Sequence, residues 1–165
     1  MQNFLLEEER MANIIYCPEK SIFEHDSNTW LVNPVNCVGV MGKGLALEFK
    51  KRYPEMFQEY KTECYRGHIT PSDCLFYPQM NIICLPTKKH WKNSSKLEYI
   101  RLGLNSILYY FAVHMEDILP CAIAFPKLGC GLGGLDWKEV HEYIRAFALL
   151  CPCETVYIHG ENPNG

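Results

Sequence analysis

A glycine-rich segment between a strand-like run and a helical run limits the possible folds most strongly. The apolar run Thr29–Asn33 predicts a strand buried on both faces, and residues 45–52 predict a helix. The segment 39–44 between them contains three glycines, which let the backbone approach a ligand closely with its N–H groups pointing inward. That geometry suits a phosphate or a ribose, although the spacing fits neither the P-loop nor the dinucleotide fingerprint. The alternative is an ordinary tight turn from strand to helix.

A second glycine-rich loop occupies the same position between a strand and a helix. Residues 121–125 predict the strand, four glycines follow within 129–134, and a helix opens at Asp136. In open α/β sheets, ligands bind where loops leave the carboxyl ends of strands. If the two strands are neighbours, the two loops face each other across one crevice, which suits an elongated ligand that carries a diphosphate and a sugar. Two independent structural turns are the alternative.

The rest of the chain alternates strands and helices. Predicted strands cover 13–16, 29–33, 74–77, 81–85, 121–125 and 155–159, and predicted helices cover 45–52, 54–66, 95–114 and the segment from 136. Capping boxes that begin at Ser95 and Asp136 predict the starts of the last two helices. This alternation indicates an α/β fold with a mostly parallel or mixed sheet covered on both faces. We expect one domain over residues 1–165, with a peripheral start at 1–12.

Composition limits the classes of partner and compartment. The formal net charge is -3, which argues against a general electrostatic nucleic-acid binder, although basic residues cluster at 50–52 and 88–101. The nine cysteines contain no C-x-x-C pair and most lie in apolar runs. We therefore expect free, mostly buried thiols in a reduced intracellular protein and no metal site. The acidic stretch Glu7–Glu9 and the lack of a long apolar run predict a cytoplasmic protein without a signal peptide or membrane span.

Three segments carry a family resemblance. Residues 32–44 (VNPVNCVGVMGKG), 86–91 (PTKKHW) and 126–137 (PKLGCGLGGLDW) together resemble macrodomains. The likeness is closest to the DarG-type branch, antitoxin macrodomains that remove ADP-ribose from thymidine in DNA, and this branch resembles the terminal ADP-ribose protein glycohydrolases. The likeness runs from about Ile14 to His159. It implies a three-layer α/β/α macrodomain with a mixed central sheet that binds ADP-ribose.

The resemblance also implies site residues and partners. It assigns catalysis to Lys88 and Asn36, the distal ribose to the first glycine loop, and the diphosphate to the backbone amides of the second. The ligand-binding residues that it implies are Cys37, Val38, Gly39, Met41, Gly42, Lys43, Gly44, Thr87, Leu128, Gly129, Cys130, Gly131, Leu132, Gly133 and Gly134. The implied partners are ADP-ribose and ADP-ribosylated nucleic acid, single-stranded DNA above all, with no cofactor and no metal. It identifies no protein partner.

Lysine chemistry gives the match at Lys88 a physical interpretation. As an ammonium, Lys88 can stabilise or protonate a leaving base; as a free amine, it can attack the anomeric carbon, and neighbouring positive charges such as Lys89 favour loss of its proton. A solvated surface lysine is the alternative. His90 is the next candidate for proton transfer, or an exposed loop histidine. Trp91 and Trp137 are expected to pack in the core, or to wall the pocket.

Three departures from the family pattern bear on function. Many macrodomains hold the adenine amino group with an aspartate just before the second strand, where this chain has Ser21. Glycohydrolases that reverse glutamate modification use an acid in the second glycine loop, about where this chain has Gly133. Full antitoxins carry a further toxin-binding domain, and the chain ends before it. Toxin binding is therefore not carried over.

The sequence favours an ADP-ribosyl hydrolase and leaves three rivals. The first is an ADP-ribose 1″-phosphate phosphatase, an activity found in related macrodomains. The second is a non-catalytic reader that binds ADP-ribose on a modified partner. The third is a structural domain whose glycine loops bind nothing.

Overall fold

The computed structural model describes residues 11–119 and 121–165, so most of the predicted peripheral start at 1–12 lies outside the described part. In chain order the elements are β1 (Asn13–Tyr16), the 3-10 helix η1 (Ile22–Glu24), β2 (Thr29–Val35), α1 (Gly44–Arg52), α2 (Pro54–Tyr65), β3 (Leu75–Tyr77), β4 (Ile82–Pro86), α3 (Leu97–Val113), α4 (Met115–Ile118), β5 (Ala122–Pro126), α5 (Trp137–Leu150) and β6 (Thr155–His159). Every predicted strand and helix is present, with ends shifted by one or two residues.

Six strands form a single mixed sheet in the order β1-β6-β5-β2-β4-β3. Neighbours are parallel except β3 and β4, which are antiparallel. A short turn joins β3 to β4, and Asn81 in that turn has a φ of 52°, a left-handed conformation that asparagine tolerates. The parallel pairs are instead joined by longer connections that contain helices, as parallel pairing requires. The predicted mixed sheet is confirmed.

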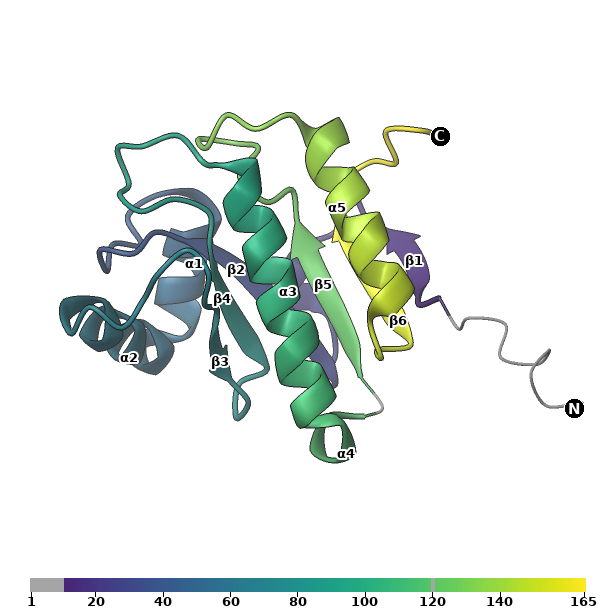
Figure 1. Cartoon of the computed structure of the whole chain (residues 1–165), viewed down its shortest axis with the longest axis horizontal. Helices are drawn as coiled ribbons and strands as arrows, with labels where there is room; N and C mark the ends of the chain where they lie inside the picture. Colours follow the sequence, from purple (N-terminus) through teal and green to yellow (C-terminus); the bar gives the residue numbers. More distant parts are fainter. Residues whose placement is uncertain (1–10, 120) are drawn as a thin grey trace, which may run out of the picture.

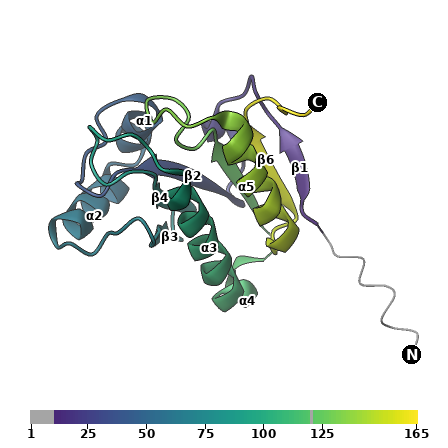
Figure 2. The same cartoon turned by 45° about the horizontal axis from the view of Figure 1, so that its top comes forward.

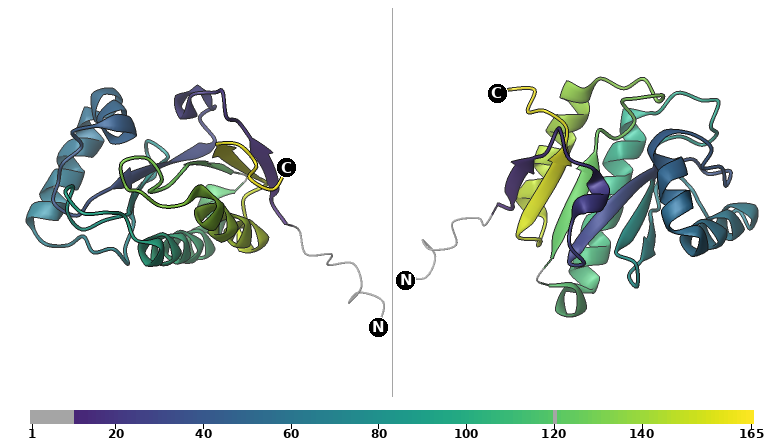
Figure 3. Two further views of the ribbon diagram at one scale, coloured as in Figure 1. Left: turned by 90° about the horizontal axis from the view of Figure 1, so that it is seen from above. Right: turned by 180° about the vertical axis from the view of Figure 1, so that it is seen from behind.

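Helices cover both faces of the sheet. In Figures 1 and 3, α3 and α5 lie on one face, and α1, α2 and η1 lie on the other. Along β2 the side chains alternate between two cores: Trp30 and Val32 pack with α3 and α5, whereas Leu31 and Val35 pack with α1 and α2. This alternation is the period of an extended strand and explains why the strand is apolar throughout. The predicted three-layer α/β/α arrangement is confirmed.

Local signals set most helix ends, with one exception. Asp136 caps α5 through a hydrogen bond from the Lys138 amide to its carboxylate at 3.2 Å, as predicted. The capping box predicted at Ser95 is wrong: α3 begins at Leu97, and the Ser95 hydroxyl donates instead to the hydroxyl of Thr87 at 3.2 Å. A tertiary partner outcompetes the local cap. Within 11–119 and 121–165, no helix is long and apolar enough to cross a membrane.

One pair of cysteines departs from the prediction of free thiols. Cys121 and Cys153 form a disulfide, whereas the other seven cysteines are free. The two residues lie 32 positions apart in the sequence, just before the parallel neighbours β5 and β6, which bring them together. No short sequence spacing such as C-x-x-C predicts this disulfide. The two cysteines are close because β5 pairs with β6, and not because they are close along the chain.

Candidate functional site

The three segments singled out in the sequence meet at one edge of the sheet. β2 lies between β5 and β4 and is parallel to both, so all three strands end at the same edge. The first glycine loop follows β2, the segment that begins at Thr87 follows β4, and the second glycine loop follows β5. Figure 1 shows the loops above the strand ends, and Figure 2 brings this edge forward. The crevice expected from neighbouring strands is present.

Backbone hydrogen bonds join these loops to one another. The Cys37 amide, at the start of the first glycine loop, donates to the Lys89 carbonyl at 2.9 Å. On the other side, the Ser95 amide donates to the Gly133 carbonyl at 2.9 Å. The loop from β4 to α3 is therefore hydrogen-bonded to both glycine loops, and the three segments form one continuous rim.

The rim encloses a pocket of about 1030 Å³, at the upper end of the range of about 300–1,000 Å³ for small-molecule sites. Of the predicted site residues, those that line it are Asn36, Gly42, Lys43, Gly44, Thr87, Lys88, Gly129, Cys130, Gly131, Leu132 and Gly133. Those that do not line it are Cys37, Val38, Gly39, Met41, Leu128 and Gly134. Both glycine loops thus contribute to the same cavity.

Two of the predicted residues outside the lining belong to the core. Met41 is fully buried, and its sulfur accepts a hydrogen bond from the Asn33 side chain at 3.8 Å. Leu128 is also fully buried, in the core under α3 and α5. Side-chain burial within the glycine-loop motifs could not be foreseen from glycine spacing. Met41 thus anchors the first glycine loop to the core, and Leu128 anchors the second.

The lining also includes residues that were not among the predicted ligand-binding residues, and most of them lie inside the three sequence segments. They are Pro34, Val35, Val40, Leu45, Ala46, Trp91, Lys92, Ser95, Pro126, Lys127, Leu135 and Trp137. Several of these lie one or two residues beyond a predicted motif, at a strand end or in the first turn of a helix. Proximity to the motif was the available signal, and only Trp91 and Trp137 had been considered as pocket walls.

Asn36 holds the first glycine loop in shape. Its Oδ1 accepts hydrogen bonds from the amides of Val38 at 3.1 Å and Val40 at 3.3 Å, and its Nδ2 donates to the Val40 carbonyl at 2.8 Å. The Tyr60 hydroxyl from α2 lies 2.7 Å from the Asn36 carbonyl and 2.9 Å from Oδ1. Burial raises the pKa of Tyr60, so its phenol stays protonated and donates. These hydrogen bonds fix the loop around Asn36, which also lines the pocket.

Ser95 and Gly133 lock the second glycine loop. Gly133 is buried, and a Cβ at this position would overlap the Ser95 hydroxyl and lie 2.5 Å from the Gly129 carbonyl oxygen. A carboxylate side chain therefore has no room at position 133. Gly129 adopts a φ of 70°, and a Cβ there would lie 2.8 Å from the Leu135 side chain. Close packing favours glycine at position 133, and the positive φ favours it at position 129.

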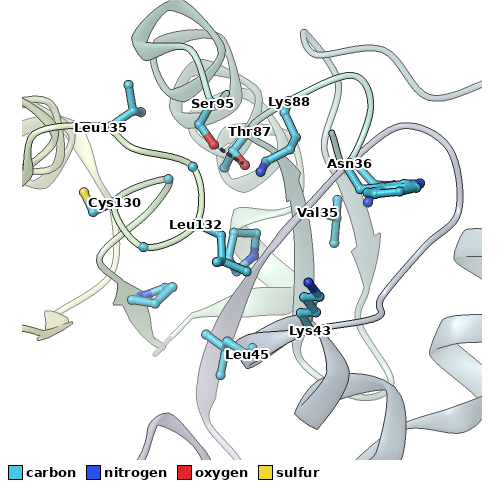
Figure 4. A pocket seen from close by; sticks show the side chains of 18 of the residues that line it. Val35, Asn36, Lys43, Leu45, Thr87, Lys88, Ser95, Cys130, Leu132 and Leu135 are labelled. Carbon is cyan, nitrogen blue, oxygen red and sulfur yellow. Dashed lines mark hydrogen bonds between the residues drawn. The ribbon is translucent and has the colours of Figure 1, made fainter. Parts of the chain in front are cut away.

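Among residues 11–119 and 121–165, four lysines and no carboxylate line the pocket: Lys43, Lys88, Lys92 and Lys127. Lys127 pairs with Glu161 at 3.0 Å, whereas the other three take part in no ion pair among the described residues. Figure 4 shows the amine of Lys88 directed into the pocket from the β4–α3 loop and that of Lys43 directed in from the first glycine loop. Unneutralised positive charge facing backbone amides favours an anionic ligand.

The remaining candidates for chemistry do not face the cavity as free groups. His90 does not line the pocket, and its Nδ1 accepts from the Lys92 amide at 3.1 Å. Cys130 lines the pocket, but burial raises the pKa of its thiol to about 11, so it is a poor nucleophile at neutral pH. Ser21 caps η1 by accepting from the Phe23 amide at 3.2 Å and lies outside the lining. In residues 11–119 and 121–165, no group of three or more His, Cys, Asp or Glu could hold a metal.

Comparison with known proteins decides the family. The Macro domain family model matches residues 32–144, which is more than half of the chain and includes all three loops. The chain belongs to the macrodomain family. The resemblance seen in the three sequence segments is thereby confirmed.

Among the known proteins that this macrodomain resembles are DNA ADP-ribosyl glycohydrolases and DarG macrodomains. It is 44% identical over 133 residues to the DNA ADP-ribosyl glycohydrolase of Mycobacterium tuberculosis, covering 76% of this chain and 37% of that protein. The macrodomain of Thermus aquaticus DarG matches with a TM-score of 0.80 at 32% identity, over 91% of this chain and 99% of that chain. Thermosipho africanus DarTG in complex with ADP-ribose matches with a TM-score of 0.77 at 27% identity, over 94% of this chain and 44% of that chain. The chain spans well under half of the length of the curated relative.

Proposed function

We propose that this macrodomain is an ADP-ribosyl hydrolase that releases ADP-ribose from a modified thymidine in single-stranded DNA. Two of its relatives, one named a DNA ADP-ribosyl glycohydrolase and one solved in complex with ADP-ribose, support this proposal. The pocket supports it independently, because it is large, positively charged and lined by backbone from two glycine loops. The proposal treats residues 1–165 as one functional macrodomain.

The shape of the pocket suits each part of ADP-ribose. Backbone amides of the second glycine loop can bind the diphosphate, since N–H groups in glycine turns form concave anion sites. The first glycine loop, held by Asn36, offers close backbone contact to the distal ribose. Lys43 and Lys88 enter from different loops and supply positive charge to the phosphates and to the reacting end. Adenine recognition is left to residues other than Ser21.

The reaction adds water across one bond. The bond between the anomeric carbon of ribose and a ring nitrogen of the base breaks; the carbon gains a hydroxyl and the nitrogen gains a proton. Lysine side chains are ammonium groups at neutral pH, so Lys88 can donate that proton and stabilise negative charge as it develops on the base. The proton that water loses restores the ammonium.

The observation that carries the proposal is that Lys88 lines the pocket whereas no carboxylate of the described part of the chain does. Most glycosidases use a pair of carboxylic acids for this chemistry, and the lining offers none. Cys130 is a protonated thiol, and Lys127 is paired with Glu161. Lys88 is therefore the group best suited to transfer a proton to the leaving base.

The test is release of ADP-ribose from thymidine-ADP-ribosylated single-stranded DNA under single-turnover conditions. We expect the wild type to release it and Lys88→Ala to be slower by roughly 10²–10⁴-fold, the usual effect of removing a general acid. Lys89→Ala is the matched control, because Lys89 is the next residue, is exposed and does not line the pocket. It should keep the rate of the chemical step.

Other outcomes identify the rivals. Equal rates for wild type and Lys88→Ala would retain the reaction and reject the role of Lys88. A lysine adduct trapped by cyanoborohydride during turnover would replace proton donation by attack of the amine on the anomeric carbon. No release, with tight calorimetric binding of ADP-ribose, would reject the hydrolase and favour a reader, unless ADP-ribose 1″-phosphate is hydrolysed. No binding of ADP-ribose would leave only a structural domain.

A further inference from the structure

The rim of the pocket carries an exposed tryptophan, whereas the other two tryptophans of the chain are buried. The side chain of Trp91 is 51% exposed, whereas Trp30 and Trp137 are 3% and 8% exposed and belong to the core. Of the two alternatives expected for Trp91, the structure fits a wall of the pocket and not packing in the core. It lies on the loop from β4 to α3, three residues after Lys88, and it contributes to the pocket lining. An exposed indole beside a binding pocket calls for a ligand-based explanation.

The loop presents this indole in a defined position. The Lys92 amide donates to His90 Nδ1 at 3.1 Å, and the Asn93 amide donates to the His90 carbonyl at 3.0 Å, which forms a tight turn around Trp91. The Lys92 amine lies 5.1 Å from the centre of the indole ring, and the His90 ring lies at the same distance. The aromatic surface is thus held in place before any ligand binds.

The charge around Trp91 is positive and is not neutralised by ion pairs among the described residues. Lys88, Lys89, Lys92 and Lys96 lie within nine residues of sequence, and none of them takes part in an ion pair among the described residues. The nearest acidic residue along the chain, Glu98, is paired with Arg101. This concentration of positive charge contrasts with a net charge of -3 for the whole chain. It favours a polyanion at this part of the rim only.

We propose that Trp91 stacks on a nucleobase that flanks the modified nucleotide, while Lys92 binds an adjacent phosphate. The inference rests on the proposed function, because bond cleavage near Lys88 places the acceptor base, and hence its strand, on the Trp91 side of the pocket. Aromatic side chains combined with lysines are the usual means of binding unpaired strands, since every base offers a flat face. A duplex, whose bases stack on one another, cannot use this platform.

The test compares two substrates that share the scissile bond. One is ADP-ribosylated thymidine as a free nucleoside, and the other is the same nucleoside within a short single-stranded oligonucleotide. We expect Trp91→Ala to lower the ratio of kcat/KM for oligonucleotide over nucleoside by about 5- to 150-fold, the range for loss of one stacked base. Trp91→Phe should retain most of the ratio because it keeps an aromatic face, whereas Trp91→Leu should not.

A base-free flank provides the matched substrate control. With abasic sites on both sides of the modified thymidine, the wild type and Trp91→Ala should give the same ratio. An unchanged ratio in Trp91→Ala with normal flanks would overturn the proposal, and so would a ratio preserved in Trp91→Leu. An equal loss on nucleoside and oligonucleotide would assign Trp91 to ADP-ribose or to the modified base itself, which also overturns it.

A binding measurement separates this inference from the proposed function. Fluorescence anisotropy with an unmodified oligothymidylate needs no turnover, and Trp91→Ala should weaken its Kd by a similar factor. If the wild type releases ADP-ribose from neither substrate but Trp91→Ala still weakens oligothymidylate binding, the hydrolase fails and the platform stands. If the wild type turns over the oligonucleotide while Trp91→Ala binds oligothymidylate like the wild type, the platform fails alone.

Discussion

Gly133→Ala tests whether close packing against Ser95 forms the second glycine loop. The added Cβ would overlap the Ser95 hydroxyl, lie 2.8 Å from the Ser95 Cβ and lie 2.5 Å from the Gly129 carbonyl oxygen. Rotation of the Ser95 side chain relieves only the first contact, because the other two involve the Ser95 Cβ and the backbone of Gly129. Gly133 does not have a positive φ, so the effect measures steric overlap and not backbone strain.

The expected size follows from overpacking a closely packed site. Inserting a methyl group against fixed atoms costs about 1–3 kcal/mol. Gly131 provides a matched control two residues away, since a Cβ there meets nothing within 4 Å. Gly131→Ala should leave the free energy of unfolding within about 0.5 kcal/mol of the wild type, or raise it slightly by restricting the unfolded chain.

Denaturant unfolding measures the loss of stability, and calorimetric titration measures the affinity for ADP-ribose. Gly133→Ala should lower the midpoint of unfolding and weaken ADP-ribose binding, because the loop amides are displaced together with the carbonyl that accepts from Ser95. Adding Ser95→Gly should recover only part of the loss, since the Gly129 carbonyl remains in place. Equal unfolding free energies for Gly133→Ala and Gly131→Ala would refute the packing argument.

Three further predictions address the first glycine loop, salt and pH. Asn36→Ala removes the side-chain bonds to Val38 and Val40 and should lower the free energy of unfolding by about 2–4 kcal/mol; a loss below about 0.5 kcal/mol in urea unfolding would contradict the bracing role. Cleavage of the modified oligonucleotide should weaken with salt, and Lys92→Ala should reduce the slope of log kcat/KM against log salt by roughly 0.7; an unchanged slope would exclude a phosphate contact. Burial lowers the pKa of His25, as does the neighbouring ring of His159, whose own pKa burial also lowers. The native state therefore favours neutral imidazoles, and stability should be full above the ordinary pKa of about 6.5 and fall as the pH drops toward the lowered native values. His25→Gln should flatten that decline in unfolding experiments between pH 5 and 7.5, and a decline of the same steepness would contradict the assignment.

The extent of sequence-based prediction differs between the elements and the site. Apolar runs and the positions of glycines were sufficient to predict the strands and helices, because each of these signals acts within a few residues. The same local logic failed at Ser95, where the hydroxyl of Thr87 is a better partner than the amide at the start of α3. It also failed for Cys121 and Cys153, whose proximity depends on the pairing of β5 with β6.

For the site, the motifs identified the loops but not the role of each side chain. Asn36 stays a predicted catalytic residue, and its hydrogen bonds show in addition that it holds the first glycine loop in shape. Tyr60, which completes that network from α2, carries no signal in the sequence because it lies 24 residues away. Met41 and Leu128 lie within the motifs but face the core. Motif membership thus indicates a neighbourhood and not an orientation.

The sequence by itself determined that strands alternate with helices, and that two glycine loops and a lysine segment follow three of the strands. Those features depend on backbone freedom and on the spacing of apolar residues, which are local properties. Only the tertiary structure decided that β5, β2 and β4 are neighbours, so that the three loops share one pocket. It also decided that Trp91 is exposed while Trp137 is buried. Burial and proximity depend on which surfaces meet when the sheet forms, and adjacent residues alone do not encode that.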